Sequence, residues 1–259
     1  MKRTLGSIML LIFISLTPFL SYSKDKIEAG IEEQLDQFIP DGIQLVNDQG
    51  ELVDLKSLID KPTVISFVYY RCPGICSPLM DGIAEVIRNS ELELGKDFQV
   101  FTISFDYTED TPLARDKRKN YLKQIKKEVN PEGWRFFTAD SANVMKATQS
   151  MGFYFLKTGN EWTHPGSLIM LSPKGKVTRY LYGTYFIPFD LKMSVAEAIE
   201  GKAVPTRMKV LKFCYAYDPA GQTYALNITR LSGVFILGIA LLIFITLAIR
   251  KKTKKSITN

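Results

Sequence analysis

The stretch FVYYRCPGICSPLM at residues 67–80 constrains the fold more than any other part of the chain. The uncharged run TVISFVYY at 63–70 is rich in β-branched and aromatic residues, which is typical of a buried central strand. A Pro-Gly turn follows at once, and then a segment with apolar residues at helical spacing. A strand that leads through a short turn into a helix predicts an α/β fold.

Two of the three cysteines, Cys72 and Cys76, lie on this turn. Proline fixes φ at one central position and glycine accepts a positive φ at the next, so residues 72–75 are predicted to form a type II turn. The turn would bring the two sulfurs together at the start of a helix, with Ser77 expected as its N-cap. The helix N-terminus and the neighbouring Arg71 are expected to favour thiolates over thiols.

Two sulfurs at this spacing fit a structural disulfide, a redox pair or a site for a soft metal ion. The placement after a strand and before a helix resembles the thioredoxin arrangement, whose redox motif is C-x-x-C. Here the spacing is C-x-x-x-C, which leaves more room for a metal. Geometry alone does not separate the three uses.

Further strands and helices alternate along the chain. The run FQVFTISF at 98–105 is the expected parallel partner of the first strand. A further strand is expected at 134–139, and two hairpins are expected, one over 43–55 and one formed by strands at 167–172 and 177–183. Helices are expected at about 112–128 after Thr111, at 141–151 and at 190–200, with a charged helical lead-in at 24–38. This order predicts a central mixed sheet flanked by helices.

The first 23 residues are typical of a secretory signal peptide. Lys2 and Arg3 precede the apolar run IMLLIFISLTPFL, and the small residues of SYS at 21–23 offer a cleavage site. The alternative is an uncleaved N-terminal anchor.

Residues 231–249 contain no charge and are long enough to cross a membrane as one helix. The basic tail at 250–259 places that end in the cytoplasm. We therefore expect a single-pass cell-membrane protein with its domain on the periplasmic or extracytoplasmic side, where disulfides can persist. Residues 201–230 are interpreted as a juxtamembrane extension.

The formal net charge of +6 comes from the two ends. Residues 1–23 and 250–259 carry seven of the 33 lysines and arginines and none of the 27 acids. The segment between them has 26 bases against 27 acids, a net charge of −1. No nucleic-acid partner is expected from this distribution.

His164 is the only histidine of the chain, which excludes His-rich zinc sites. It lies on a Pro-Gly loop just before the strand expected at 167–172. In a thioredoxin-like sheet this loop lies beside the cysteine turn, so that a Cys₂His ligand set suited to copper is available. The alternative is a structural histidine with no ligand role.

The segments FVYYRCPGICSPLMDGIAEV, FTISFDYTEDTP and THPGSLIMLSPKGKVTRYLYG resemble the three signature blocks of the Sco/SenC family, over roughly residues 40–200. The resemblance implies a thioredoxin-like fold for a domain at 24–200. It also implies a membrane-tethered protein that delivers copper to the binuclear site of cytochrome c oxidase subunit II, or to another copper-accepting membrane protein. Many members are anchored at the N-terminus, whereas residues 212–230 resemble a branch with a C-terminal membrane segment.

Carried over residue by residue, the resemblance implies that Cys72, Cys76 and His164 are the ligands of one copper ion, Cu⁺ or Cu²⁺. It also singles out the acidic loop from Asp106 to Pro112. Asp106 is expected to form hydrogen bonds within its loop, or alternatively to support the site or dock a partner. Cys214 is predicted to stay free.

Two other functions stay open. The protein could be a thiol–disulfide oxidoreductase in which Cys72 and Cys76 are catalytic, Cys72 attacks, and the cysteines of the oxidase copper site or of other exported proteins are reduced. It could also be a redox-sensing or scaffold protein. His164 discriminates the first alternative, because a copper site needs this imidazole and a reductase does not. We expect a metallochaperone rather than an enzyme.

Overall fold

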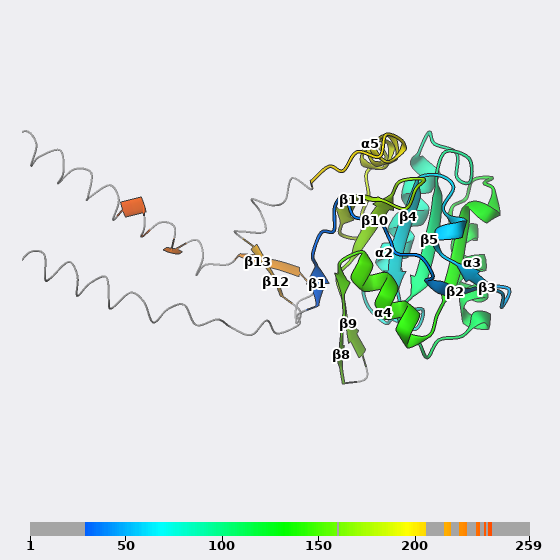
Figure 1. Cartoon of the computed structure of the whole chain (residues 1–259), viewed down its shortest axis with the longest axis horizontal. Coiled ribbons are helices and arrows are strands. Elements are labelled where there is room, and N and C mark those ends of the chain that lie inside the picture. Colours follow the sequence, from blue (N-terminus) through cyan, green and yellow to red (C-terminus); the bar gives the residue numbers. More distant parts are fainter. Residues whose placement is uncertain are drawn as a thin grey trace, which may run out of the picture.

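Figure 1 shows a computed structural model of the chain. It describes residues 29–159, 161–205, 215–218 and 223–226, and residues 232, 233, 236, 238 and 239. The signal peptide predicted at 1–23, the basic tail, Cys214 and most of the segment 231–249 lie outside the described residues. Within the part of the chain that is described, no helix has the length and apolar character needed to span a membrane.

A seven-stranded mixed sheet forms the centre of the domain (Figure 1). In spatial order its strands are β11 (Val177–Tyr182), β10 (Ser167–Leu171), β4 (Thr63–Val68), β5 (Gln99–Ser104), β6 (Trp134–Thr138), β2 (Gln44–Asn47) and β3 (Leu52–Asp54). The strands β4, β5 and β6 are parallel, and the other neighbouring pairs are antiparallel. The predicted mixed α/β class and both predicted hairpins, at 43–55 and 167–183, are confirmed.

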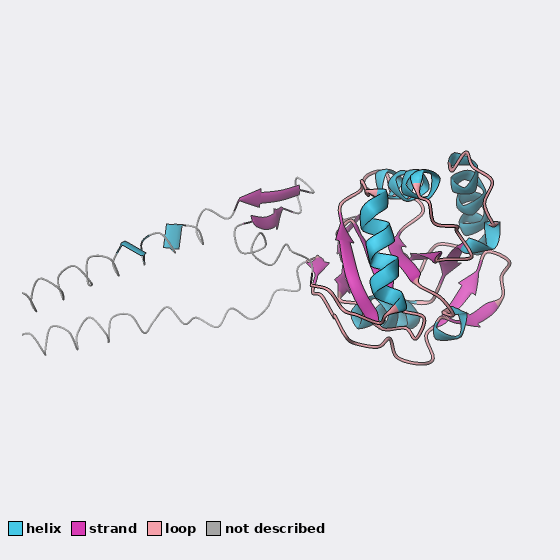
Figure 2. Cartoon of the chain, turned by 90° about the horizontal axis from the view of Figure 1, so that it is seen from above, coloured by secondary structure: helices cyan, strands magenta, loops and turns pink. Residues whose placement is uncertain are grey.

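Within the described part of the chain, four helices pack around this sheet (Figure 2). The helix α2 (Cys76–Asn89) connects β4 to β5, and α3 (Thr111–Gln124) connects β5 to β6. Crossovers between parallel strands are right-handed, so both helices lie on the same face, where they contact each other. The helix α4 (Ser141–Ser150) follows β6, and α5 (Pro188–Ile199) packs against β10 and β11. Short 3₁₀ helices, η2 (Lys56–Leu58) and η3 (Pro131–Gly133), complete the connections.

The two central strands, β4 and β5, show why these elements could be predicted from the sequence. Every residue of β4 and every residue of β5 is buried, as expected for parallel strands covered on both faces. Continuous apolar runs are needed at such positions, and the sequence shows them. The turn that carries Cys72 and Cys76 follows the end of β4.

The helix starts differ from the prediction, by two residues in α2 and by one residue in α3. The helix α2 begins at Cys76, with Ile75 as an N-cap that is already in helical conformation and no side-chain capping bond, so Ser77 is not the N-cap. The chain enters the helix earlier because the turn before it already runs in the right-handed region. In α3 the N-cap is Asp110 instead of Thr111, and its carboxylate accepts a hydrogen bond from the Leu113 N–H at 3.2 Å.

Three small sheets were not predicted. They pair β1 (Gly30–Ile31) with β7 (Phe153–Tyr154), β8 (Leu156–Thr158) with β9 (Glu161–Thr163), and β12 (Tyr215–Asp218) with β13 (Thr223–Leu226). The β8–β9 hairpin projects from the lower edge of the domain in Figure 1. The helical lead-in expected at 24–38 is wrong for its described part, residues 29–38, which contains β1 and turns.

Candidate metal centre

The sheet topology brings the two predicted parts of the site together. Cys72 lies four residues after the end of β4, and Cys76 is the first residue of α2. His164 lies between β9 and β10, and β10 pairs antiparallel with β4. The loop before β10 therefore lies against the loop after β4. The two sulfurs and the imidazole all lie within 4.8 Å of one another.

The three side chains differ in their access to solvent. Cys76 and His164 are 4% and 3% exposed, whereas Cys72 is only partly buried. The Cys76 sulfur lies 3.4 Å from the Nε2 atom of His164. A ligand or partner that approaches from solvent therefore reaches Cys72 first.

The cysteine turn is not a type II turn. Gly74 does not adopt the positive φ that this turn type requires at its third position. The chain passes through Ile75 with φ −69° and ψ −21°, which leads directly into α2. The Gly74 N–H instead points at the Cys72 sulfur, at 3.4 Å, as a hydrogen-bond donor.

Contacts on both sides of the ring fix His164. Its Nδ1 atom lies 3.1 Å from the Pro165 carbonyl oxygen. A carbonyl oxygen only accepts hydrogen bonds, so Nδ1 carries the proton in this contact and Nε2 is the nitrogen available to a metal ion. The rings of Phe105, Tyr69 and Phe153 surround the imidazole, with centroids at 5.0, 5.8 and 6.3 Å.

The two thiols differ in protonation. A hydrogen bond from Cys76 lowers the pKa of Cys72 from its ordinary value of 9.0 to about 3. Burial, followed by the neighbouring Cys72 sulfur, raises the pKa of Cys76 far above its ordinary value. The expectation that the helix N-terminus favours both thiolates is therefore wrong for Cys76 in the metal-free protein, because at that position burial outweighs the helix dipole.

This donor set fits a copper ion. Two sulfurs and one imidazole nitrogen form a soft ligand group, and imidazole also tolerates the oxidised ion. The Nδ1 contact leaves Nε2 directed toward the Cys76 sulfur. The role of the three residues as ligands stays a prediction, while their proximity is an observation.

The loop between β5 and α3 contains the acidic residues Asp106 and Glu109, and only Asp106 was singled out from the sequence. Asp106 accepts hydrogen bonds from the N–H and hydroxyl of Thr108, at 3.0 and 2.7 Å, so its predicted loop bonding is confirmed. The buried acid of this loop is Glu109, which the sequence did not single out. Only its place within the acidic loop could have indicated it.

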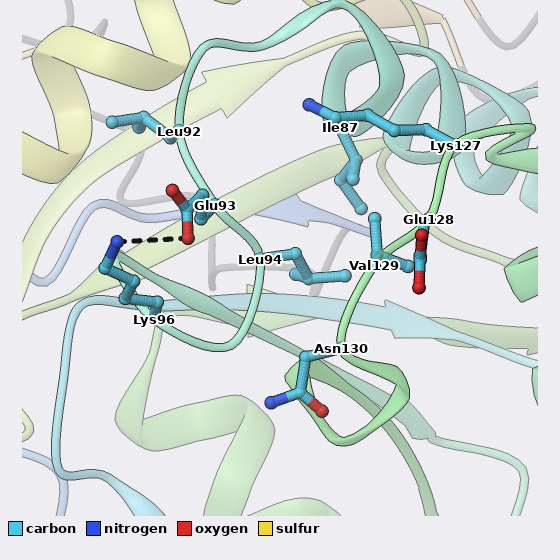
Figure 3. A pocket seen from close by; sticks show the side chains of 9 residues that line it. All are labelled: Ile87, Leu92, Glu93, Leu94, Lys96, Lys127, Glu128, Val129 and Asn130. Atoms are coloured by element: carbon cyan, nitrogen blue, oxygen red, sulfur yellow. Dashed lines mark hydrogen bonds and ion pairs between the residues drawn. The ribbon is translucent and has the colours of Figure 1, made fainter.

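A surface hollow of about 370 Å³ lies away from this cluster (Figure 3). Its lining residues are Ile87, Leu92, Glu93, Leu94, Lys96, Lys127, Glu128, Val129 and Asn130. Lys96 pairs with Glu93 at 3.1 Å, and the Lys127 ammonium donates to the Ser90 carbonyl. None of the three ligand candidates contributes to this hollow, so its size does not make it the functional site.

The fold and the cluster define a thioredoxin-like domain with a Cys-Cys-His group able to hold a metal ion. The chain belongs to the SCO1/SenC family, which it matches over residues 33–200. The family-level resemblance seen in the sequence is thereby confirmed. The branch with a C-terminal membrane anchor stays a prediction.

Solved structures agree with this assignment. A structure from Aquifex aeolicus VF5 is 27% identical, with a TM-score of 0.59, and the match covers 64% of this chain and 95% of that one. The copper-bound ScoI of Arabidopsis thaliana is 22% identical with a TM-score of 0.50, over 61% and 95% of the two chains. A SCO1/SenC family lipoprotein from Bacillus anthracis str. Ames is 18% identical with a TM-score of 0.51, over 66% and 98%. The last two show the fold alone. A comparison with curated proteins finds no match.

Proposed function

We propose that this chain binds one copper ion through Cys72, Cys76 and His164 and delivers it to the binuclear copper site of cytochrome c oxidase. The observation that carries the proposal is the convergence of two sulfurs and one imidazole from distant parts of the chain within 4.8 Å. Membership of the SCO1/SenC family and the copper-bound ScoI of Arabidopsis thaliana support copper as the metal.

Unequal exposure of the ligands suggests how copper would leave. Cys76 and His164 are buried, so an acceptor thiol would first displace the half-buried Cys72. Exchange of one thiolate for another keeps the charge of the site unchanged. The acceptor's second thiol and its other ligands would then replace Cys76 and His164.

A membrane tether would keep the domain close to its acceptor. The segment 231–249 is proposed to cross the membrane, with the domain on the extracytoplasmic side and the basic tail in the cytoplasm. The acceptor is then a membrane protein on the same side, such as oxidase subunit II.

Copper stoichiometry and visible absorption of the reduced full-length chain test the proposal. We expect one copper per chain with a sulfur-to-Cu²⁺ charge-transfer band, and we expect His164→Ala to lose or shift this band. Thr163→Ala is the matched control, because the Thr163 hydroxyl forms a hydrogen bond with the Thr158 hydroxyl across the β8–β9 hairpin, at 3.1 Å. Weak binding that is equal in all three proteins would contradict the proposed copper site.

The second candidate is a thiol–disulfide oxidoreductase, which the unequal thiols favour. The Cys72 thiolate would attack an acceptor disulfide, form a mixed disulfide and release one acceptor thiolate. The Cys76 sulfur, after losing its proton, would attack Cys72, which releases the second acceptor thiol and leaves a Cys72–Cys76 disulfide. Two electrons pass to the acceptor. His164→Ala would leave this reduction intact while the copper absorption band is lost or shifted, so the same variant separates the two functions.

A further inference from the structure

Glu109 is a buried carboxylate beside the cysteine turn. It lies in the loop between β5 and α3 and is 6% exposed. Its Oε2 atom accepts hydrogen bonds from the Tyr70 N–H and from the Ser104 hydroxyl, both at 2.6 Å. Its Oε1 atom accepts from the Arg71 N–H at 2.7 Å. One side chain thus holds two successive backbone amides of the segment that leads to the site.

These two amides are the middle of a turn that ends at Cys72. The Cys72 N–H donates to the Tyr69 carbonyl at 3.2 Å, which closes the turn 69–72 around Tyr70 and Arg71. Glu109 therefore holds both central residues of the turn from outside it. The residue that this turn delivers is the half-buried ligand candidate of the site.

The amides need this acceptor because the neighbouring strand ends before it can reach them. The strand β5 pairs in parallel with β4 up to Ser104, and the Phe105 N–H still donates to the Val68 carbonyl at 2.8 Å. Beyond Phe105 the chain turns into the acidic loop, so β5 offers no carbonyl to the amides of Tyr70 and Arg71. The carboxylate of Glu109 takes the place of the missing strand.

A carboxylate is the side chain that fits this place. It offers an acceptor on each oxygen, whereas the amide of glutamine offers one oxygen and would turn an N–H group toward one of the two backbone donors. Burial raises the pKa of Glu109, while the hydrogen bonds from Ser104, Tyr70 and Arg71 oppose the rise. Among the described residues no lysine or arginine forms an ion pair with it, so these hydrogen bonds carry its stabilisation.

We propose that Glu109 is a positioning residue of the metal centre, whose carboxylate fixes the turn 69–72 and thereby holds the Cys72 sulfur at the distance from Cys76 and His164 that a shared ion requires. The inference rests on the proposed copper-binding function. It adds Glu109, which would contact neither the metal ion nor the side chains of the three ligand candidates. It predicts that a change at Glu109 alters both copper binding and the coupling of the two sulfurs.

The test compares the full-length chain with Glu109→Gln, in a Cys214→Ser background so that only the two site cysteines react. Copper affinity is measured by competition with a chelator, together with the sulfur-to-copper absorption band. We expect affinity to fall about tenfold or more and the band to shift, because one amide of the turn loses its acceptor. Asp106→Asn is the matched control from the same loop, and we expect it to behave as the parent protein because, among the described residues, its carboxylate accepts hydrogen bonds only from Thr108.

A second readout needs no copper. The equilibrium of the Cys72–Cys76 disulfide against glutathione reports how well the turn holds the two sulfurs together. We expect Glu109→Gln to shift this equilibrium toward the dithiol by about tenfold, with Asp106→Asn unchanged. If the parent protein binds no copper, the proposed function fails while this measurement still decides the role of Glu109.

Thermal unfolding shows whether the Glu109→Gln variant folds. If it does not fold, amide hydrogen exchange of the parent protein still tests the inference. In the metal-free parent protein the amides of Tyr70 and Arg71 should exchange far more slowly than exposed loop amides, because both donate to a buried carboxylate. Rapid exchange of these amides overturns the inference. So does a folded Glu109→Gln with unchanged copper affinity, absorption band and disulfide equilibrium.

Discussion

At the scale of single residues, Cys72 and Cys76 share one turn but differ in chemistry. Cys72 is half-buried and its pKa is lowered to about 3, chiefly by the hydrogen bond from Cys76. Cys76 is buried and its pKa is raised by that burial. In the reduced, metal-free protein the half-buried Cys72 sulfur is therefore the thiolate and the buried Cys76 sulfur carries the proton.

This difference predicts selective alkylation at mildly acidic pH. Cys72 is ionised at any pH above about 3, whereas an ordinary thiol with a pKa of 9.0 is protonated at ~pH 5. We expect iodoacetamide to modify Cys72 and to leave Cys76 unmodified under these conditions. Peptide mapping by mass spectrometry after timed exposure of the reduced chain measures both rates.

The paired variant for this experiment is Cys76→Ala, which removes the principal hydrogen-bond donor to Cys72. Without that donor the pKa of Cys72 should rise toward its ordinary value, and its alkylation at acidic pH should slow. Equal rates for Cys72 in the folded and the urea-unfolded chain would contradict the assignment. The denatured chain serves as the reference because its cysteines have ordinary pKa values.

The sequence could predict the ligand candidates but not their inequality. Cys72 and Cys76 stand out by their spacing on one turn, and His164 stands out because the chain has no other histidine. The burial of Cys76, and of Glu109 within an acidic loop, depends on how distant segments pack. An acidic residue in a charged loop is expected to be exposed to solvent. The hydrogen bonds from backbone amides to Glu109 could therefore be seen only in the three-dimensional structure.

At the scale of elements, the helix α2 lies unusually close to the loop that follows β11. Gly82 is in the middle of this helix, and a Cβ atom placed on it would lie 2.0 Å from the Thr184 carbonyl oxygen. The same loop donates from the Gly183 N–H to the Gly166 carbonyl, two residues after His164. The absent side chain therefore lets the helix that carries Cys76 approach the part of the fold that carries His164.

This contact predicts the opposite of the usual glycine-to-alanine effect. In an exposed helix interior the change stabilises by about 1 kcal/mol, whereas Gly82→Ala should destabilise by roughly 1–3 kcal/mol because the Thr184 backbone must move. Urea unfolding measures the difference. Gly30→Ala is the matched control: its added Cβ atom meets nothing within 4 Å, and its φ is not positive. A Gly82→Ala protein as stable as the parent would contradict this expectation, because the Thr184 loop would then move at no cost in stability.

The elements that the sequence predicted are those with a strong local pattern. The fully buried β4 and β5 read as unbroken apolar runs, and the hairpin of β10 and β11 has a Pro-Lys-Gly-Lys turn. The β8–β9 hairpin was missed because all three residues of β8 are exposed and no apolar alternation marks it. The start of α3 was misplaced by one residue because Asp110 and Thr111 are both capping residues, and only the backbone conformation chooses between them. The start of α2 was misplaced by two residues because Ile75, which has no side-chain cap, already lies in helical conformation.

At the scale of the whole molecule, the site depends on contacts between segments far apart in the chain. Cys76 and His164 are separated by 88 positions, yet their side chains lie 3.4 Å apart because β10 returns to pair with β4. The thioredoxin-like fold was predictable from the order of strands and helices together with the family resemblance. The family match over residues 33–200 includes every strand of the central sheet and all three ligand candidates.

The proposed tether belongs to this scale, because it decides where the folded domain works. Residues 231–249 carry no charge, and at 1.5 Å per residue a helix of this length spans about 28 Å, close to the ~30 Å hydrocarbon core. We expect the full-length chain to remain in the membrane fraction after an alkaline wash, and a chain ended after residue 230 to be released. Protease added to spheroplasts should digest the domain of the full-length protein, because the basic tail is expected to keep the other end in the cytoplasm. If the shortened chain also stays with the membrane, an uncleaved segment at 1–23 is the anchor, and N-terminal sequencing would find it intact. A full-length chain recovered in the soluble fraction would instead remove the tether from the proposal and leave copper binding to be judged on the domain alone.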